Sequence, residues 1–146
     1  MKASKILTVL SVLFISVSLF AGNMVKEDKT DIEQTITNYV KSVDSQNADN
    51  LSKSLLSTGS VITLNSITKT VDHYSGDQFI NLVKNGQKSG WVRNVTVNSV
   101  DTDGNTAIAK VDITDAKLKQ TGFFTLVKDN GNWKVASEVT TLELNK

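Results

Sequence analysis

The chain has 146 residues, of which 39% are hydrophobic and 21% charged, with a formal charge of +1 and neither cysteine nor proline. This length indicates one domain, and the absence of cysteine excludes disulfides, thiolate nucleophiles, zinc–thiolate sites and iron–sulfur clusters. A charge so close to zero leaves no basic excess for coating a phosphate backbone, so no nucleic-acid partner is predicted.

Residues 1–22 predict an export signal. Lys2 and Lys5 precede an uncharged apolar and hydroxyl run over residues 6–20, and the small residues Ala21 and Gly22 follow. This order is typical of a secretory signal, and the run is shorter than the roughly 20 residues that span a bilayer. Cleavage after residue 21 or 22 is favoured, with an uncleaved N-terminal anchor as the alternative. We therefore expect a periplasmic or extracellular protein without a stable membrane span after cleavage.

Removal of the signal changes the charge of the remaining chain. Lysine plus arginine falls from 16 to 14 when Lys2 and Lys5 leave, against 15 acidic residues, so the formal charge becomes −1. An exported domain without disulfides must be stabilised by its core alone, and about 120 residues are enough for that. We expect residues 23–29 to be a polar tether and residues 30–146 to form the domain.

Helical periodicity marks the first part of this domain. Thr30 or Asp31 can cap a helix that ends near Ser45, and Thr30 and Glu33 have the spacing of a capping box. Its apolar stripe consists of Ile32, Ile36, Tyr39, Val40 and Val43.

Two shorter helices are predicted further along the chain. The first follows a cap at residues 47–49, carries Leu51, Leu55 and Leu56, and ends at Gly59. The second begins with a capping box of Ser75 and Gln78 and closes at Gly86.

Alternating residues predict the strands. Residues 61–65 and 67–74 favour a bent strand pair, and residues 91–102, 105–115, 117–128 and 133–139 favour four longer strands. Asp103–Gly104 and Asn130–Gly131 are hairpin-turn dipeptides. Helices first and a long antiparallel meander second indicate an α+β domain, with the helices on one face of a curved sheet.

Two stretches resemble a known family: SVDTDGNTAIAKVDI (99–113) and TGFFTLVKDNGNWKVASEVT (121–140). Their pattern, and the order of elements over roughly residues 30–142, resemble the NTF2-like superfamily and most closely its putative lumazine-binding branch. Gly122–Phe123 stands where that branch often has an acidic–aromatic pair, and Glu138 where it often has lysine.

The resemblance implies a cone-shaped α+β fold. N-terminal helices would pack on a curved antiparallel sheet of four main strands plus a short bent strand pair, with a pocket between the long helix and the concave face. It also implies a possible homodimer through the sheet. Relatives include steroid isomerases, polyketide cyclases, dehydratases and non-enzymatic transport factors, so the fold alone does not name the function.

Five residues are candidates for the pocket. His73 is the single histidine and would be the general base of an enzyme; the alternative is a partly exposed or structurally satisfied histidine. Arg93, on a strand face with Trp91, would bind an anionic ligand group, reach out to water, or pair with an acid such as Glu138. Tyr39 would aim its hydroxyl into the pocket or be a core tyrosine.

Trp91 and Ser137 complete the candidate set, because strand parity places both on inward faces. Trp91, Phe123, Phe124 and Trp133 are also the aromatic side chains expected in the core.

Parity places no carboxylate on the inward faces of the last four strands, where Val139 follows Ser137. Steroid-isomerase chemistry needs a basic carboxylate, so this absence speaks against it, although a β-bulge would reverse the faces. The calcium-loop-like Asp101-x-Asp103-x-Asn105 lacks the glycine and glutamate of such loops, so no metal site is predicted. We therefore favour a non-enzymatic domain that binds a small, partly apolar ligand or a protein partner and needs no cofactor. The alternative is an isomerase-, cyclase- or dehydratase-like enzyme that uses His73.

Overall fold

The computed structural model describes residues 28–145, of which those from Ile32 onward belong to one compact unit. A first helix over residues 28–44 is followed by α2 (Ala48–Ser54), β1 (Leu55–Asn65), β2 (Thr70–Ser75) and α3 (Gly76–Lys84). The meander then consists of β3 (Asn94–Asp103), β4 (Thr106–Thr114), β5 (Leu118–Asp129) and β6 (Asn132–Leu144). The predicted export signal, and residues 23–27 of the predicted tether, lie outside the described residues.

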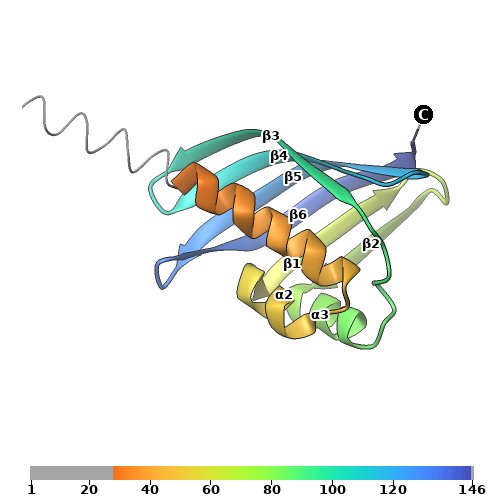
Figure 1. Ribbon diagram of the computed structural model, residues 1–146, viewed down its shortest axis with the longest axis horizontal. Helices are drawn as coiled ribbons and strands as arrows, with labels where there is room; N and C mark the ends of the chain where they lie inside the picture. Colours follow the sequence, from red (N-terminus) through yellow and green to blue (C-terminus); the bar gives the residue numbers. More distant parts are fainter. Residues whose placement is uncertain (1–27, 146) are drawn as a thin grey trace, which may run out of the picture. The chain divides into compact units, whose positions relative to one another are not determined.

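All six strands of the described chain form one curved sheet in the order β2-β1-β6-β5-β4-β3. Neighbouring strands are antiparallel except β1 and β6, which run parallel. From Ile32 onward the first helix crosses one face of this sheet, with α2 and α3 near the β1 and β2 end (Figure 1). The α+β class and helix-covered sheet are confirmed. The predicted strand pair, however, belongs to the main sheet, and the sheet is mixed because β1 joins the last strand of the chain.

The predicted stripe of the first helix is buried as expected. Its five apolar side chains are at most 2% exposed and belong to the same core cluster as Phe124 and Leu126 of β5. The predicted cap at Thr30 or Asp31 is wrong, because residues 28–31 are already helical. Residues 28 and 29, assigned to the tether from the sequence, are therefore helical as well.

The second helix is shorter than predicted. Leu55 is extended and begins β1, so α2 ends at Ser54, and Gly59 lies inside the strand. A Cβ on Gly59 would stand 3.0 Å from the carbonyl oxygen of Ala136 on β6 and 2.9 Å from that of Leu56. Gly59 thus permits the close approach of two backbones at an irregular point of β1, and does not end a helix.

The third helix and the two hairpin turns are confirmed. Ser75 and Gln78 form the predicted capping box of α3. Asn130 and Gly131 both adopt positive φ in the turn between β5 and β6, as a two-residue hairpin loop requires. The strand predicted from Trp91 begins only at Asn94, and residues 85–93 form a connection that helps to line a cavity between the first helix and the sheet.

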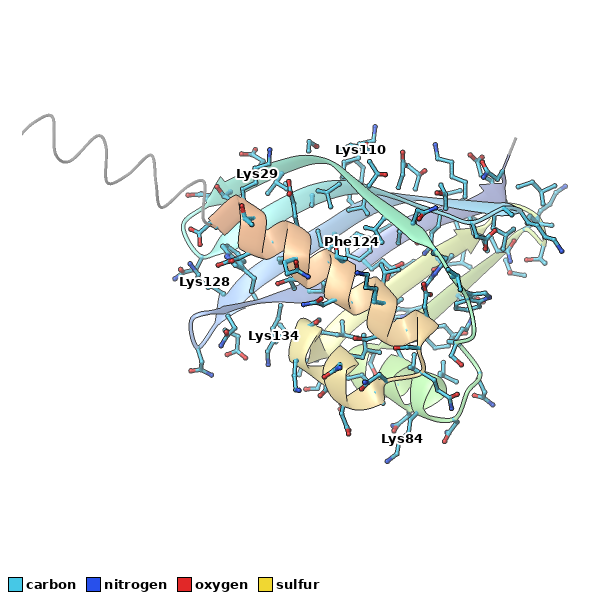
Figure 2. All side chains as sticks on the ribbon, viewed as in Figure 1. Lys29, Lys84, Lys110, Phe124, Lys128 and Lys134 are labelled. Atoms are coloured by element: carbon cyan, nitrogen blue, oxygen red, sulfur yellow. The ribbon has the colours of Figure 1, made fainter. Side chains whose placement is uncertain are left out.

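Two of the four predicted core aromatics are buried. Phe124 is fully buried between the first helix and the sheet (Figure 2), and Trp133 is also in the core. Phe123 is 51% exposed and Trp91 38% exposed, so their prediction as core residues is wrong. Phe123 alternates with Phe124 along β5 and therefore faces outward, and Trp91 lies in the connection before β3.

Candidate functional site

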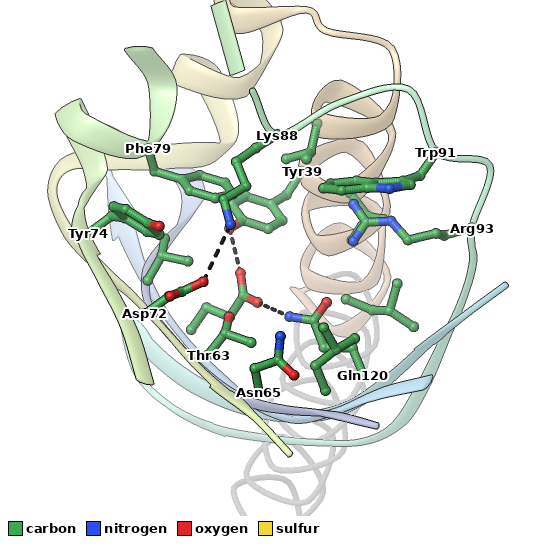
Figure 3. Close-up of a pocket in the computed structure, with 16 residues that line it drawn as sticks. Tyr39, Thr63, Asn65, Asp72, Tyr74, Phe79, Lys88, Trp91, Arg93 and Gln120 are labelled. Carbon is green, nitrogen blue, oxygen red and sulfur yellow. Dashed lines mark hydrogen bonds and ion pairs between the residues drawn. The ribbon is translucent and has the colours of Figure 1, made fainter. Parts of the chain in front are cut away.

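A cavity of about 150 Å³ lies between the first helix and the concave face of the sheet (Figure 3). Every layer of the domain contributes to its wall: the first helix, strands β1, β2, β4, β5 and β6, helix α3, and the connection 85–93. Its lining residues are Tyr39, Val40, Val43, Val61, Thr63, Asn65, Asp72, Tyr74, Phe79, Lys88, Trp91, Arg93, Ile113, Gln120, Glu138 and Leu142. A cavity of about this volume in an engineered protein core takes up benzene, so the space suits a small ring system.

Aromatic rings form one side of the cavity. The ring of Tyr39 is stacked 6.2 Å from that of Phe79 and meets Phe124 edge-on at 5.6 Å. Tyr74 of β2 lies 6.2 Å from Phe79 on the other side. These contacts hold a row of rings against which a flat ligand can pack.

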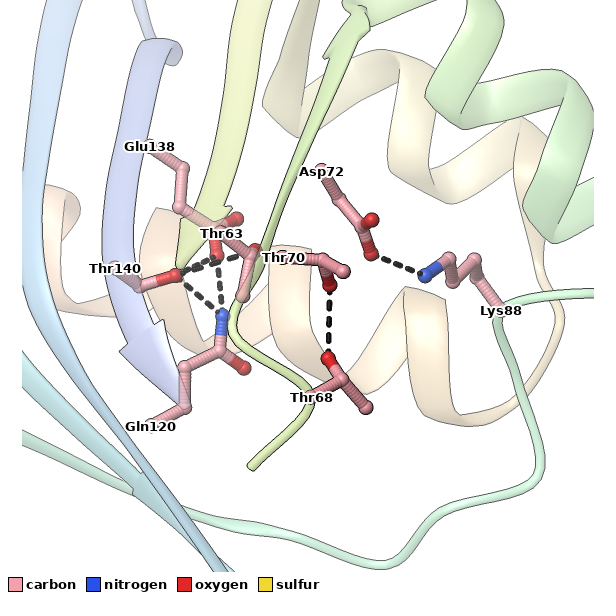
Figure 4. A network of polar contacts seen from close by, with 8 residues as sticks. All are labelled: Thr63, Thr68, Thr70, Asp72, Lys88, Gln120, Glu138 and Thr140. Carbon is pink, nitrogen blue, oxygen red and sulfur yellow. Dashed lines mark hydrogen bonds and ion pairs between the residues drawn. The ribbon is translucent and has the colours of Figure 1, made fainter. Parts of the chain in front are cut away.

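A chain of hydrogen bonds forms the opposite, polar side (Figures 3 and 4). The Tyr39 hydroxyl donates to Glu138 Oε2 at 2.5 Å. The Gln120 amide Nε2 donates to Glu138 Oε1 and to Thr140 Oγ1, both at 2.7 Å. Thr140 Oγ1 is 3.2 Å from Glu138 Oε1 and 3.4 Å from Thr63 Oγ1. One buried carboxyl group thus links the first helix to β5 and β6.

A β-bulge turns Glu138 toward the cavity. Leu126 of β5 pairs with Val135, but the preceding Thr125 pairs with Ser137, so Ala136 is an extra residue on β6. One extra residue exchanges the two faces of the strand beyond it. Val135 and Glu138 therefore both face inward, and Ser137 and Val139 do not, contrary to the parity prediction that found no carboxylate there.

Burial shapes the acidity of this pair. Glu138 is only 3% exposed, and its burial raises the pKa of the carboxyl above the ordinary glutamate value. Hydrogen bonds from Tyr39, Thr140 and Gln120 and the charge of Arg93 oppose that shift. Burial and the neighbouring Glu138 raise the pKa of the Tyr39 hydroxyl well above its usual value, so the phenol stays protonated near neutral pH.

The connection 85–93 is fixed to the end of the first helix by Arg93. Its guanidinium Nη2 lies 2.6 Å from Asp44 Oδ1, its Nε donates to the same oxygen at 2.7 Å, and its backbone N–H donates to Oδ2. Gly90 N–H also donates to the carbonyl of Asp44. The guanidinium stacks 4.8 Å from the Trp91 ring. Arg93 therefore holds Trp91 against the cavity, and its partner is Asp44, not Glu138 as the sequence suggested.

A second pair of charges stands at the cavity wall. Lys88 Nζ lies 3.5 Å from Asp72 Oδ2 and 5.4 Å from the Tyr74 ring centre. Both side chains are about one-third exposed, so solvent screens this ion pair. Such a pair opens at little energetic cost, which leaves both groups available to a ligand at the mouth.

The structure brings three of the five predicted site residues to the cavity: Tyr39, Trp91 and Arg93. His73 is exposed and does not line it, because its neighbours Asp72 and Tyr74 on β2 face inward. Its Nε2 lies 3.3 Å from Ser60 Oγ on the outer face. Ser137 also misses the cavity, because it lies on the opposite face of β6 from Glu138.

Sequence reasoning missed most polar groups of the cavity, and Glu138, Gln120, Asp72 and Lys88 are the ones that carry its hydrogen-bond network and its ion pair. Glu138 was missed because the bulge at Ala136 reverses the inward and outward faces that strict alternation along β6 predicts. The resemblance did provide a signal for Glu138, since glutamate there replaces a frequent lysine. Among residues 28–145, no group of three or more acidic or histidine side chains is placed to hold a metal ion. Within the same range, no helix combines the length and the hydropathy that a membrane crossing requires.

Comparisons with known proteins agree with this architecture. The family model described as "Putative lumazine-binding" matches residues 27–139. The search of curated proteins gives no match.

Among solved structures, an NTF2-like protein of unknown function from Silicibacter pomeroyi is similar with a TM-score of 0.68 and 16% identity, over 83% of this chain and 98% of that one. An NTF2-like protein of unknown function from Shewanella baltica has a TM-score of 0.63 and 16% identity, covering 82% and 95%. A ketosteroid isomerase-like protein from Erwinia carotovora atroseptica has a TM-score of 0.60 and 12% identity, covering 77% and 94%. At these identities the likeness establishes the NTF2-like fold.

Proposed function

We propose, since this chain belongs to the putative lumazine-binding family of NTF2-like domains, that its cavity binds a small, flat, partly apolar molecule without transforming it. The observation that carries the proposal is the two-sided cavity. Aromatic rings line one side, and the other side is lined by polar groups that hydrogen-bond to one another. Small-molecule sites combine apolar walls with a few fixed polar groups in this way.

On the polar side, Gln120 can accept a hydrogen bond from a ligand. Gln120 donates to Glu138 and to Thr140 through the same atom, its amide Nε2. Its amide oxygen points into the cavity, toward Trp91 (Figure 3). A ligand N–H or O–H placed beside Trp91 therefore has an acceptor ready, and Glu138 fixes the orientation of that amide.

The same network supports binding over catalysis. A general base needs a free lone pair within reach of the substrate proton. Glu138 Oε1 accepts hydrogen bonds from Gln120 and Thr140, Oε2 accepts one from Tyr39, and the side chain is almost completely buried, which limits its access to a substrate proton. These contacts suit a role in which Glu138 holds the side chains of Tyr39 and Gln120 in position.

The test is binding of lumazine, with phenol as a smaller probe, measured by calorimetry on the full chain. We expect saturable binding that weakens about tenfold, or about 1.4 kcal/mol, in Gln120→Ala. Phe123→Ala, on the outer face, is the matched control and should bind like the wild type. Absence of binding by both probes, together with no small molecule retained in native mass spectrometry of the purified protein, would refute the proposal.

A second candidate is an isomerase-, cyclase- or dehydratase-like activity that uses Glu138 with Tyr39. The raised pKa of the Glu138 carboxyl favours it, because enzymes tune carboxyl groups upward for proton transfer. Deuterium uptake by cyclohexanone in D₂O, followed by NMR, tests proton abstraction directly. An accelerated uptake that Glu138→Gln abolishes and His73→Ala leaves intact would replace the binding proposal by this one.

Export and self-association complete the proposal. The support for export is the charge and hydropathy pattern of residues 1–22, and N-terminal sequencing of the protein from bacterial cells should find cleavage after residue 21 or 22. The support for a homodimer through the sheet is an exposed outer face on which Phe123, Val139 and Ile62 are direct cross-strand neighbours. Light scattering should give a dimer for the wild type and a monomer for Phe123→Asp. A monomeric wild type would refute it.

A further inference from the structure

A second groove lies on the other side of the first helix, between this helix and α2, and has a volume of about 290 Å³. Its lining residues are all of polar types: asparagine, lysine and serine from both helices, with neither a carboxylate nor an apolar residue among them. The cavity between the first helix and the sheet shares none of these residues. A ligand in this groove would therefore bind independently of the proposed function.

The two helices contribute the same three residue types at the same spacing. Asn38, Lys41 and Ser42 follow the pattern Asn-x-x-Lys-Ser, and Asn50, Lys53 and Ser54 repeat it in α2. Residues three and four apart lie on one face of a helix, so each helix presents its set as a unit. The two sets face each other across the groove, with Ser45 beside them.

The two serines form the buried part of the groove. Ser42 is 5% exposed and Ser54 is 6% exposed. Within the described chain neither hydroxyl has a hydrogen-bond partner. No fully buried side-chain polar atom of the described residues lacks a partner, so both hydroxyls must open onto the groove. Two deep hydroxyls without protein partners are positioned for a bound group.

The other groups of the groove are donors. Lys53 Nζ contacts only Asn50 Oδ1, at 3.1 Å, and no carboxylate among residues 28–145 pairs with it or with Lys41. Asn38 Oδ1 accepts a hydrogen bond from Gln34. Because the amide oxygens of both asparagines are occupied, their NH₂ groups, the two ammonium groups and the two hydroxyls remain for a ligand.

We propose that this groove binds a phosphate group, as free phosphate or as a small soluble phosphate monoester. A groove with six donors, two positive charges and no carboxylate favours an oxyanion over a neutral or cationic ligand. The buried serines set the depth at which the anion is held. The lysines, on flexible stems, close over it from the two helices.

The experiment is a ¹H–¹⁵N NMR titration of the full chain with sodium phosphate and with glycerol 3-phosphate, with ionic strength held constant by sodium chloride. We expect saturable shifts confined to residues 38–45 and 50–54. The variant Lys41→Ala/Lys53→Ala should weaken binding at least tenfold. Two control variants should leave phosphate affinity unchanged. They are Lys84→Ala, on α3 outside the groove, and Glu138→Gln, in the cavity between the first helix and the sheet.

The serine variants separate binding from helix stabilisation. Ser42→Ala and Ser54→Ala remove hydroxyls without protein partners and introduce a better helix former, so the melting temperature without phosphate should hold or rise. Phosphate affinity should nevertheless fall several-fold. Equal affinity in these variants, shifts that merely follow ionic strength, or binding only to phosphatidic acid vesicles and to neither soluble probe would each overturn the proposal.

Discussion

The inner face of the sheet has two halves that meet at the bulge in β6. On one side of Ala136, in the closed half, Val135 and its cross-strand partner Leu126 belong to the same buried core as Ile32 and Ile36 of the first helix. On the other side, Glu138 pairs with Phe124, lines the cavity and accepts a hydrogen bond from Thr140. Strands β5 and β6 therefore supply core packing in one half and the proposed binding surface in the other, and one extra residue separates the two roles.

The largest expected effect is in the closed half. Leu126→Ala removes a fully buried side chain opposite Val135 in the core cluster, and such truncations cost about 2–5 kcal/mol of the free energy of unfolding. Urea denaturation measures it. A loss below about 1 kcal/mol would mean that the closed half is not the stabilising half, and the comparison would fail.

Tyr39→Phe tests the border between the two halves. It keeps the ring contacts with Phe79 and Phe124 but removes the donor that meets Glu138 Oε2. A buried acceptor left without its donor costs about 1–3 kcal/mol. Tyr74→Phe is the matched control, since the Tyr74 hydroxyl has no hydrogen bond in the described chain, and it should stay within about 0.5 kcal/mol. Equal effects of the two substitutions in urea denaturation would contradict a special role for the Tyr39–Glu138 contact.

Glu138→Gln tests how the cavity half contributes to the pH dependence of the free energy of unfolding. Because burial raises the pKa of Glu138, the folded chain binds this proton more tightly than the unfolded chain. The contribution of Glu138 is therefore most favourable below its unfolded pKa, near 4.5, and declines as pH rises through the raised folded pKa. The free energy of unfolding of the wild type relative to Glu138→Gln should fall as pH rises above about 4.5.

The difference between the two proteins isolates this effect. Hydrogen bonds lower the pKa of Asp112 and Asp115, which gives the opposite slope in acid, but both proteins share these groups. A wild-type-minus-variant difference that is flat or rises with pH would show that the hydrogen bonds to Glu138 outweigh its burial.

The smallest expected effect is at Phe123, the neighbour of Phe124. Its ring is half-exposed and meets Val139 across the outer face, a contact worth below about 1 kcal/mol. Phe123→Ala should therefore change the urea midpoint little at low protein concentration. A loss at low protein concentration as large as that of Leu126→Ala would contradict the weak outer-face contact within one chain.

Local signals predicted much of this fold. The 3.6-residue stripe from Ile32 to Val43, the capping box at Ser75 and the turn at Asn130–Gly131 each depend on residues close in sequence, and all three are observed. Tyr39 could be placed at the cavity for the same reason, because its stripe must face the sheet.

The remaining features depend on contacts between distant segments. The bulge at Ala136 carries no residue signature, and without it parity sends Glu138 outward and Val139 inward. The inward side of β2 is set by its pairing with β1, so His73 could not be told from Asp72 by sequence alone. Leu55 and Leu56 fit the helical pattern, and only the pairing of Leu55 with Val135 makes them part of a strand.

The parallel pairing of β1 with β6 determines when the domain can be completed. Without the 13 residues of β6, the sheet falls into two separate pieces, β2-β1 and β5-β4-β3, with no shared edge. Joining them means closing a loop across most of the domain, which is a slow step in folding. A chain emerging from the ribosome therefore has no finished core until its last strand is made. For a protein that we propose to be exported, this late closure delays folding until β6 has been synthesised.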